Sequence, residues 1–248
     1  MTTENNARFN AEALSWDANP DVILATSLAH KAYLSRLPPA DVLSTFDVLD
    51  LGCGTGLLSL ALAPAVRSVT SVDPAEGMIA ALNAKLSRNA DDDSSEGATK
   101  NVLPVCALLQ DPDDPRLARD PVTGEDRPRR RFHLAVSHLV LHHIPDLQPV
   151  FKTLHGLLAP GGKVMVTDFE NFGPEARKFH PESKMEGVER HGIKREEMRR
   201  ILEEAGFAEV SVETAFEMEK KVETEPGSGV FGPTMVFPFL ICQGTKGE

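Results

Sequence analysis

The chain has 248 residues, and its 26 lysines and arginines stand against 37 aspartates and glutamates, a net charge of −11. This acidic balance disfavours nucleic acid as a partner, because a polyanion is bound through a positive footprint. Three cysteines are too few for a disulfide framework. Apolar stretches stay well below the ~20 residues that span a bilayer, and the polar first residues carry no signal-peptide or presequence pattern. We therefore expect one domain in the cytoplasm with no membrane span.

The spacing of apolar residues predicts a helical start followed by alternating strands and helices. Residues 1–40 fit a helical pattern, with Leu24, Leu28 and Ala32 on one stripe, which stops at Pro38-Pro39. Helical spacing recurs at residues 78–86 and 150–158, between short β-rich runs at residues 46–51, 69–72, 102–109, 132–137 and 163–167. Strands that alternate with helices in this way form right-handed βαβ units and a parallel sheet.

The C-terminal part departs from this alternation. Residues 195–205 predict a helix that is closed by Gly206 and turns four residues inward: Met198, Ile201, Leu202 and Ala205. Two late strands follow, near residues 209–216 and 235–242, with little helix between them. We expect them to pair as an antiparallel hairpin.

Two polar stretches interrupt the pattern. Residues 87–101 are poor in hydrophobic residues and predict a surface loop that folding does not need. Residues 111–131 include Arg-Pro-Arg-Arg-Arg at 127–131, a run that invites a polyanion-binding interpretation. Six arginines in this stretch stand against six acidic residues. We therefore favour a solvated loop whose charges pair among themselves and which is equally dispensable.

The most specific motif is VLDLGCGTG at residues 48–56, where a strand runs into a glycine-rich turn and then a helix. Gly52, Gly54 and Gly56 permit a tight turn and the close approach of a ligand. Asp73 comes 21 residues after Gly52, where a dinucleotide fold places the carboxylate that binds a ribose. Together they predict an adenosine-type ligand across the carboxyl ends of the first two strands. The glycine spacing differs from that of the nicotinamide fingerprint.

Four segments together resemble the class I S-adenosylmethionine-dependent methyltransferases. VLDLGCGTG and SVDPAEGMIAALN (residues 71–83) resemble the first two cofactor motifs of that family. FHLAVSHLVLHHIPD (residues 132–146) and LLAPGGKVMVTD (residues 157–168) resemble its fourth and fifth strand regions. The similarity is greatest to the small-molecule branch typified by quinone-biosynthesis methyltransferases. It implies an enzyme that uses S-adenosylmethionine to methylate a small organic acceptor by direct displacement.

The resemblance also implies a role for individual residues around the cofactor. The glycine turn, which includes Cys53, would pass under the methionine part of the cofactor, and Asp50 would support its amino group. Asp73 would hold both ribose hydroxyls. The adenine would lie near Pro74, Ala75 and Met78, with Gln110 and Asp111 at its amino group, and the sulfonium over Ser137 and His138.

The histidines after the fourth strand are the candidates for chemistry on the acceptor. His142 and His143 are predicted to act as a general base or to orient the acceptor, although a structural role at a turn is the alternative. His138-x-x-x-His142 has half of a zinc-binding pattern, but Leu139 replaces the catalytic Glu and we identify no third ligand, so we expect no metal. His180, His191 and Asp168 are secondary candidates for acceptor contact.

The combined prediction is a Rossmann-like, doubly wound α/β fold. Its sheet would have seven strands, mostly parallel, with an antiparallel C-terminal hairpin. The single methyltransferase domain (1–248) would divide into an N-terminal helical cover (1–40), a cofactor-binding core (41–171), a substrate cover (172–194) and a C-terminal helix with a strand pair (195–248). Two alternatives stay open: a protein or RNA methyltransferase that docks through residues 127–131, and a catalytically silent cofactor-binding regulatory module.

Overall fold

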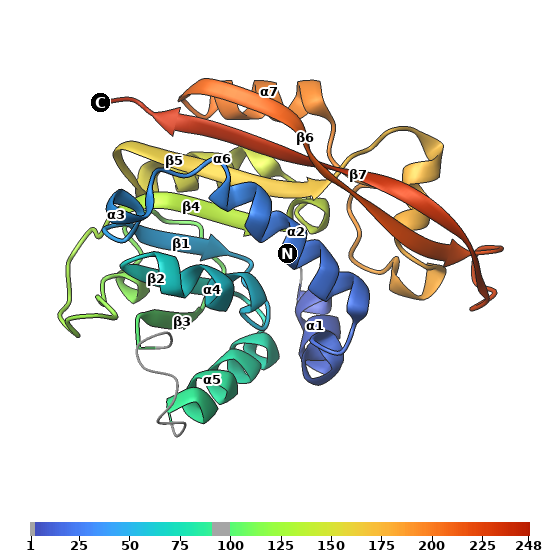
Figure 1. The fold of residues 1–248 in the computed structure, drawn as a ribbon, viewed down its shortest axis with the longest axis horizontal. Helices are drawn as coiled ribbons and strands as arrows, with labels where there is room; N and C mark the ends of the chain where they lie inside the picture. Colours follow the sequence, from blue (N-terminus) through green and yellow to red (C-terminus); the bar gives the residue numbers. More distant parts are fainter. Residues whose placement is uncertain (1–2, 91–99) are drawn as a thin grey trace.

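A seven-stranded sheet forms the centre of the structure, a computed structural model that describes residues 3–90 and 100–248. The strand order is β3-β2-β1-β4-β5-β7-β6, with β1 to β5 parallel and β7 antiparallel between β5 and β6 (Figure 1). The predicted fold class is confirmed. The strands are β1 (Asp47–Leu51), β2 (Ser68–Asp73), β3 (Val102–Cys106), β4 (Phe132–His138), β5 (Leu158–Phe169), β6 (Phe207–Glu223) and β7 (Phe231–Lys246).

Helices cover both faces of this sheet. One face carries α6 and α7, which pack with Leu49, and the other carries α2 and α4, which pack with Val48. Successive residues of a strand point to opposite faces of the sheet, so both faces are apolar. None of the described helices is long and apolar enough to cross a bilayer. The α-helices are α1 (Thr3–Trp16), α2 (Pro20–Leu34), α3 (Ala40–Leu43), α4 (Leu57–Leu62), α5 (Glu76–Ala90), α6 (Leu147–Leu157) and α7 (Arg195–Glu204).

The N-terminal helices lie over the carboxyl end of the sheet. Helix α1 runs beside α5 (Figure 1), and the Gly77 N–H donates to Asn10 Oδ1 over 2.7 Å. The predicted helical start is present, but its stripe is partly wrong, because Leu24 is 44% exposed. The buried face of α2 consists instead of small residues and one tyrosine: Ala25, Thr26, Ala29, Ala32 and Tyr33.

The C-terminal hairpin is present and much longer than predicted. β6 and β7 pair from Phe207 with Lys246 to Glu223 with Phe231, so the hairpin projects beyond the rest of the sheet (Figure 1). The four residues predicted to face inward on α7 are buried, and Gly206 ends the helix with φ of +99°. Where the hairpin leaves the sheet, Phe237 and Phe239 pack against Phe179 of the segment at 174–179, and Phe216 stacks on Phe239.

The arginine-rich stretch departs from the expectation of a solvated loop at a few positions. Arg130 is only 5% exposed, and its guanidinium donates to Thr70 Oγ1 over 2.9 Å and to Ser68 Oγ over 2.7 Å. Asp120 is buried as well, and it pairs with Arg67 and Arg127 at 2.6 and 3.0 Å. A buried charge must be paired to be tolerated, so these two residues anchor the stretch to the sheet. Most of its other residues are exposed, and its dispensability stays a prediction.

The remaining loop predictions concern the pairing of charges within residues 111–131 and the stretch at 87–101. The expected pairing of charges is present, since Arg131 and Arg129 both bind Asp113, at 2.7 and 3.4 Å. Helix α5 continues to Ala90. The first residues of the stretch at 87–101 are therefore helical, where a loop was predicted. Residues 91–99 of that prediction lie outside the described residues.

Candidate active site

The glycine turn is shaped by three residues with left-handed backbone. Gly52, Gly54 and Gly56 have φ of +70°, +53° and +81°. A Cβ on Gly52 would lie 2.4 Å from Val140 Cγ2, so this glycine is required by packing. A Cβ on Gly54 would meet nothing closer than 4.0 Å. The turn therefore packs tightly at its edges and opens at Gly54 into a cavity.

Asp73, the last residue of β2, fastens this turn to the neighbouring strand. Its Oδ2 accepts the Gly54 N–H over 2.9 Å, and its Oδ1 accepts the Ala75 N–H over 2.8 Å. Burial raises the pKa of Asp73. Because each carboxylate oxygen can accept two hydrogen bonds, both oxygens keep capacity for a ligand hydroxyl.

Asp50 lies deeper, behind the turn. Ser59 Oγ donates to Asp50 Oδ2 over 2.6 Å, and Ser71 Oγ donates to Ser59 over 2.7 Å. Burial raises the pKa of Asp50 to about 7. The Cys53 thiol is also buried, which raises its pKa, so it has no thiolate character.

A cavity of about 80 Å³, which we call the glycine-turn pocket, lies against this turn. An adjoining cavity of about 340 Å³ shares Gly52 and Val140 with it and reaches Pro74 and Gln110. Ser137 lies behind the wall, with its hydroxyl donating to Leu51 O over 2.8 Å. Among the predicted site residues, those that line the glycine-turn pocket are Asp50, Gly52, Cys53, Gly54, Asp73, Met78, His138 and His143.

The other predicted positions lie outside these walls. Gly56 begins α4 behind the turn and faces Leu82. Asp111 caps its own loop by accepting the Asp113 N–H over 2.8 Å, and it is not among the described residues that line either cavity.

Helix α1 closes the glycine-turn pocket from above, which the motifs did not reveal. Phe9 and Trp16 line the pocket. Asp17 fastens this end of α1, because it accepts a hydrogen bond from Thr55 Oγ1 and pairs with Lys85. Thr55 and Lys85 lie 38 and 68 positions from Asp17 in the sequence, so no local sequence pattern could have revealed these contacts.

His138 is held at the edge of the pocket by two buried hydroxyls. The Tyr33 hydroxyl donates to Ser137 O over 2.7 Å and lies 2.9 Å from Thr167 Oγ1. Thr167 Oγ1 in turn lies 2.8 Å from His138 Nδ1. Burial lowers the pKa of His138 to about 4, so its ring is neutral. Among the described atoms, Nε2 has no hydrogen-bond partner.

His142 is the most firmly oriented histidine of the site. Its backbone N–H donates to Asp168 Oδ2 over 3.0 Å, and its Nδ1 lies 2.9 Å from both carboxylate oxygens of Asp168. This places the proton on Nδ1 and leaves Nε2 as the acceptor. The residue is 2% exposed, and Nε2 finds no partner within the described part of the chain.

His143 and His180 complete a cluster with His142. The His143 Nδ1–H donates to Gly187 O over 2.7 Å, and burial lowers the pKa of His143 to about 2. The ring centroid of His142 lies 3.9 Å from that of His143 and 5.0 Å from that of His180. One ring nitrogen from each of the three lies within 4.8 Å of the other two. The sequence identified no third ligand beside His138 and His142; the structure instead brings His143 and His180 to His142, without His138.

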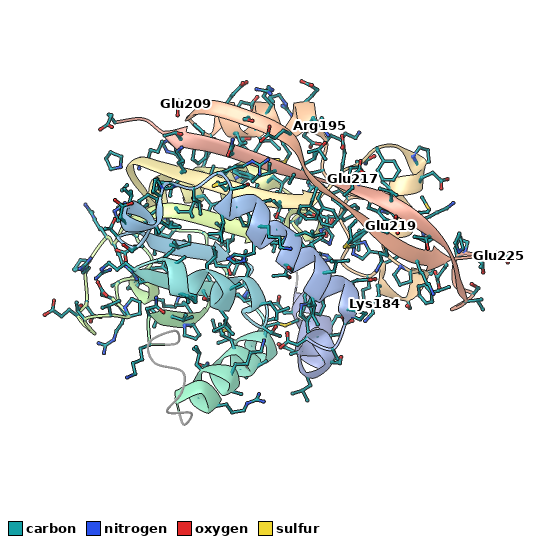
Figure 2. All side chains as sticks on the ribbon, viewed as in Figure 1. Lys184, Arg195, Glu209, Glu217, Glu219 and Glu225 are labelled. Carbon is teal, nitrogen blue, oxygen red and sulfur yellow. The ribbon has the colours of Figure 1, made fainter. Side chains whose placement is uncertain are left out.

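A larger cleft of about 940 Å³ opens over this cluster, and we call it the histidine cleft. It shares Trp16, Val22, Leu139 and His143 with the glycine-turn pocket. Two pairs of its charged wall residues bind each other, Lys184 with Glu12 and Lys220 with Asp21. Figure 2 labels Lys184 and Glu219, which line this cleft from the segment at 172–194 and from the hairpin.

Leu139 separates the two cavities in a strained conformation. Its φ is +57°, which is costly for a branched side chain, and its N–H donates to Thr167 O over 2.9 Å. The strain turns the chain sharply after β4, so that the next residues reach back over the carboxyl end of the sheet. Both cavities thus meet at the switch point between β1 and β4, where doubly wound folds bind ligands.

Comparison with known proteins agrees with this arrangement. Residues 17–212 match the family model of a methyltransferase domain. The chain is 30% identical over 151 residues to an uncharacterized methyltransferase of Schizosaccharomyces pombe, which is 60% of this chain and 48% of the relative. It is 29% identical over 161 residues to a ubiquinone biosynthesis O-methyltransferase of Coxiella burnetii, with 65% and 59% covered. The chain thus spans about half to three fifths of these curated relatives.

The fold is shared with solved structures at low sequence identity. The N-methyltransferase NodS from Bradyrhizobium japonicum, solved with S-adenosyl-L-homocysteine, superposes with a TM-score of 0.58 at 16% identity, covering 99% of this chain and 98% of NodS. The chain belongs to the class I S-adenosylmethionine-dependent methyltransferases. This confirms the family, the enzyme class and the cofactor predicted from the motifs.

Proposed function

We propose that this enzyme transfers a methyl group from S-adenosylmethionine in the glycine-turn pocket to a small organic acceptor in the histidine cleft. The observation that supports this most is the meeting of the two cavities at Trp16, Leu139 and His143. The acceptor's lone pair would attack the methyl carbon there while the carbon–sulfur bond breaks and its electrons go to sulfur. Close alignment in a site with little water accelerates such a displacement.

The donor would be held mainly by the glycine turn and Asp73. Gly52 and Gly54 would pass under its methionine part, and Asp73 would accept both ribose hydroxyls. Pro74, Met78 and Gln110 would surround the adenine in the adjoining cavity. Asp50, fixed by Ser59, would support the donor's amino group from behind the turn.

His142 is the residue that we propose to act on the acceptor. Its Nε2 is unpartnered among the described residues, and Asp168 fixes the direction of its ring. His143 is less suited to take up a proton, because burial strongly lowers its pKa. Of the two histidines predicted as base or acceptor-orienting group, we therefore favour His142, with His143 as a neighbouring contact.

A small acceptor is favoured over a macromolecule by the state of the arginine run. Arg130 is buried, and Arg127 and Arg131 are engaged by Asp120 and Asp113. A docking patch for a polyanion needs unpaired cations, whereas these arginines are buried or paired with carboxylates. One curated relative is itself a quinone-pathway O-methyltransferase.

The test is a metabolite extract incubated with a methyl-labelled donor and the purified protein, followed by separation of small molecules from macromolecules. We expect label in a small organic product, and about tenfold less of it with a Gly54→Ala variant when the donor is kept below saturation. Label in the RNA or protein fraction would instead establish the macromolecular alternative. Donor binding with no labelled product from any fraction would favour the silent regulatory module.

A further inference from the structure

We infer that His142, His143 and His180 form a binding site for a divalent transition-metal ion, with zinc as the first choice, in the wall of the histidine cleft. The three residues come from two separate segments, since His180 follows the turn at 174–179. The inference rests on the proposed function in one respect, that the cleft holds the acceptor. It adds how His142 acts there, through a bound cation.

The geometry suits a site with three nitrogen ligands. The candidate ligand atoms lie within 4.8 Å of one another. Tetrahedral zinc with Zn–N of 2.0–2.1 Å places its nitrogens about 3.3 Å apart, so ring rotations that draw the three atoms together by about 1 Å suffice. Imidazole ligands favour zinc and its neighbours over magnesium and calcium, which prefer oxygen.

A second observation points to a ligand at this position. The Nε2 atom of His142 is buried and has no hydrogen-bond partner in the described structure, although burying such an atom unpaired is costly. A metal ion on Nε2 would satisfy it. The atom belongs to a residue that lines the cleft, so a bound ion would be reachable from the acceptor side.

The outer contacts of the cluster are those of metal-binding histidines. Ligating histidines donate their second ring N–H to a carboxylate or a backbone carbonyl, which fixes the ring and raises its basicity. His142 Nδ1 faces the Asp168 carboxylate, and His143 Nδ1–H donates to Gly187 O. Asp168 also places a negative charge behind the proposed ion.

The protonation of the cluster is compatible with metal binding. Burial lowers the pKa of both His143 and His180, so both rings stay neutral and their lone pairs stay available. Three protein ligands leave a fourth coordination position open in a zinc site. In this fold that position would face the histidine cleft, where an oxygen, nitrogen or sulfur of the acceptor could bind.

Cobalt(II) is the probe, because it occupies zinc sites and its visible absorption reports the ligands. The full chain is freed of metal with EDTA and titrated with Co²⁺ by calorimetry and absorption. We expect a single Co²⁺ per chain, a tetrahedral visible band without a thiolate charge-transfer band, and displacement by Zn²⁺. The absence of the thiolate band separates this site from binding at the exposed thiol of Cys106.

Variants assign the site. His180→Ala should weaken Co²⁺ binding at least about 100-fold, because even outer partners of a ligand are worth about 10–100-fold. Asp168→Asn, a positioning change, should weaken it by about 10–100-fold. His155→Ala, in α6 and packed on Phe207 outside the cluster, is the matched control and should bind as the unchanged chain does. The melting temperature of each variant, and His180→Gln if His180→Ala unfolds, separates ligand loss from misfolding.

The outcomes for the metal and for the proposed function are distinct. No Co²⁺ binding, a thiolate band, or unchanged affinity in a folded His180 variant overturns the metal site. If the EDTA-treated protein then still methylates a small molecule, the proposed function survives with His142 acting alone. Co²⁺ bound as predicted, with no methylated product from any acceptor, supports the site and contradicts the proposed function.

Discussion

The two halves of the active site are built in different ways. The donor half comes from nearby sequence, since the glycine turn at 52–56 and Asp73 lie 21 residues apart at most. The acceptor half is assembled from α1, the turn at 141–143, the segment at 172–194 and the projecting hairpin. One half is therefore set by a local backbone requirement and the other by long-range packing. A sequence motif therefore identifies the donor half, but it contains no information on the acceptor half.

The largest expected effect is that of replacing His142, which should impair the acceptor half of the site and leave the donor half intact. His142→Ala should lower turnover by about 10²-fold or more, whether Nε2 takes up the acceptor's proton itself or holds the cation that binds the acceptor, with donor affinity unchanged. The reason is that His142 lines the histidine cleft and not the glycine-turn pocket. Turnover and donor calorimetry are measured on the same preparation, with His155→Ala, whose ring packs on Phe207 and lines neither cavity, as the control. Equal loss of donor affinity would show that the halves are not separate.

Arg130 tests whether the amino-terminal edge of the sheet depends on its buried charges. Arg130→Ala should lower the free energy of unfolding by about 1–3 kcal/mol, because it removes the buried donor to Ser68 and Thr70 and one of the cations beside Asp47, which keeps its pair with Arg67. Arg129→Ala is the matched control one residue away, and its side chain is 77% exposed. It should change stability by less than about 1 kcal/mol. Urea titrations of both variants check this, and equal stabilities would restore the surface-loop interpretation.

Two glycines of the same turn should fail for different reasons. Gly54→Ala meets open space, so it should cost only about 1–2 kcal/mol of stability for its left-handed backbone. Its methyl group would project into the glycine-turn pocket and weaken donor binding about tenfold or more, about 1.4 kcal/mol. Gly52→Ala would collide with Val140 and should be the less stable of the two. Thermal melting and donor calorimetry of the pair give both quantities.

The smallest expected effect is the acid dependence of the buried ion pairs. Although burial opposes it, hydrogen bonding to Arg67 and to backbone amides lowers the pKa of Asp120 to about 2. A carboxyl with a lowered folded-state pKa stabilises the fold above its unfolded pKa, and this contribution is lost as the pH falls through the folded value. The stability gap between the unchanged chain and Asp120→Asn should therefore shrink from about pH 4 to pH 2. A gap that stays constant over this window would contradict the assignment.

What could be predicted from the sequence follows the same division between the donor half and the acceptor half. The alternation of strands and helices and the glycine turn could be predicted, because apolar periodicity and Gly54 carry local signals. Leu24 was assigned to the wrong face of α2, because the sheet accepts a narrow stripe of small residues there. His180 could not be joined to His142, since only the folded segment at 172–194 brings them together.

Burial of charge was the other feature beyond the reach of sequence. The arginine run has balanced composition, which suggests a solvated loop, yet Arg130 enters the core because Ser68, Thr70 and Asp47 line its path. These partners lie some 60 to 80 positions away in the sequence. Composition counts charges, whereas only the fold determines which of them lose water.

The most direct test of the central claim is the affinity of the glycine-turn pocket for its donor. Calorimetry is run with S-adenosylmethionine and with NAD on the unchanged chain and on Asp73→Ala. We expect S-adenosylmethionine to bind, NAD not to bind, and Asp73→Ala to lose about 1.5–3 kcal/mol of binding free energy, the scale of hydrogen bonds to a charged acceptor. Tight NAD binding, or a donor affinity that Asp73→Ala leaves unchanged, would contradict the account.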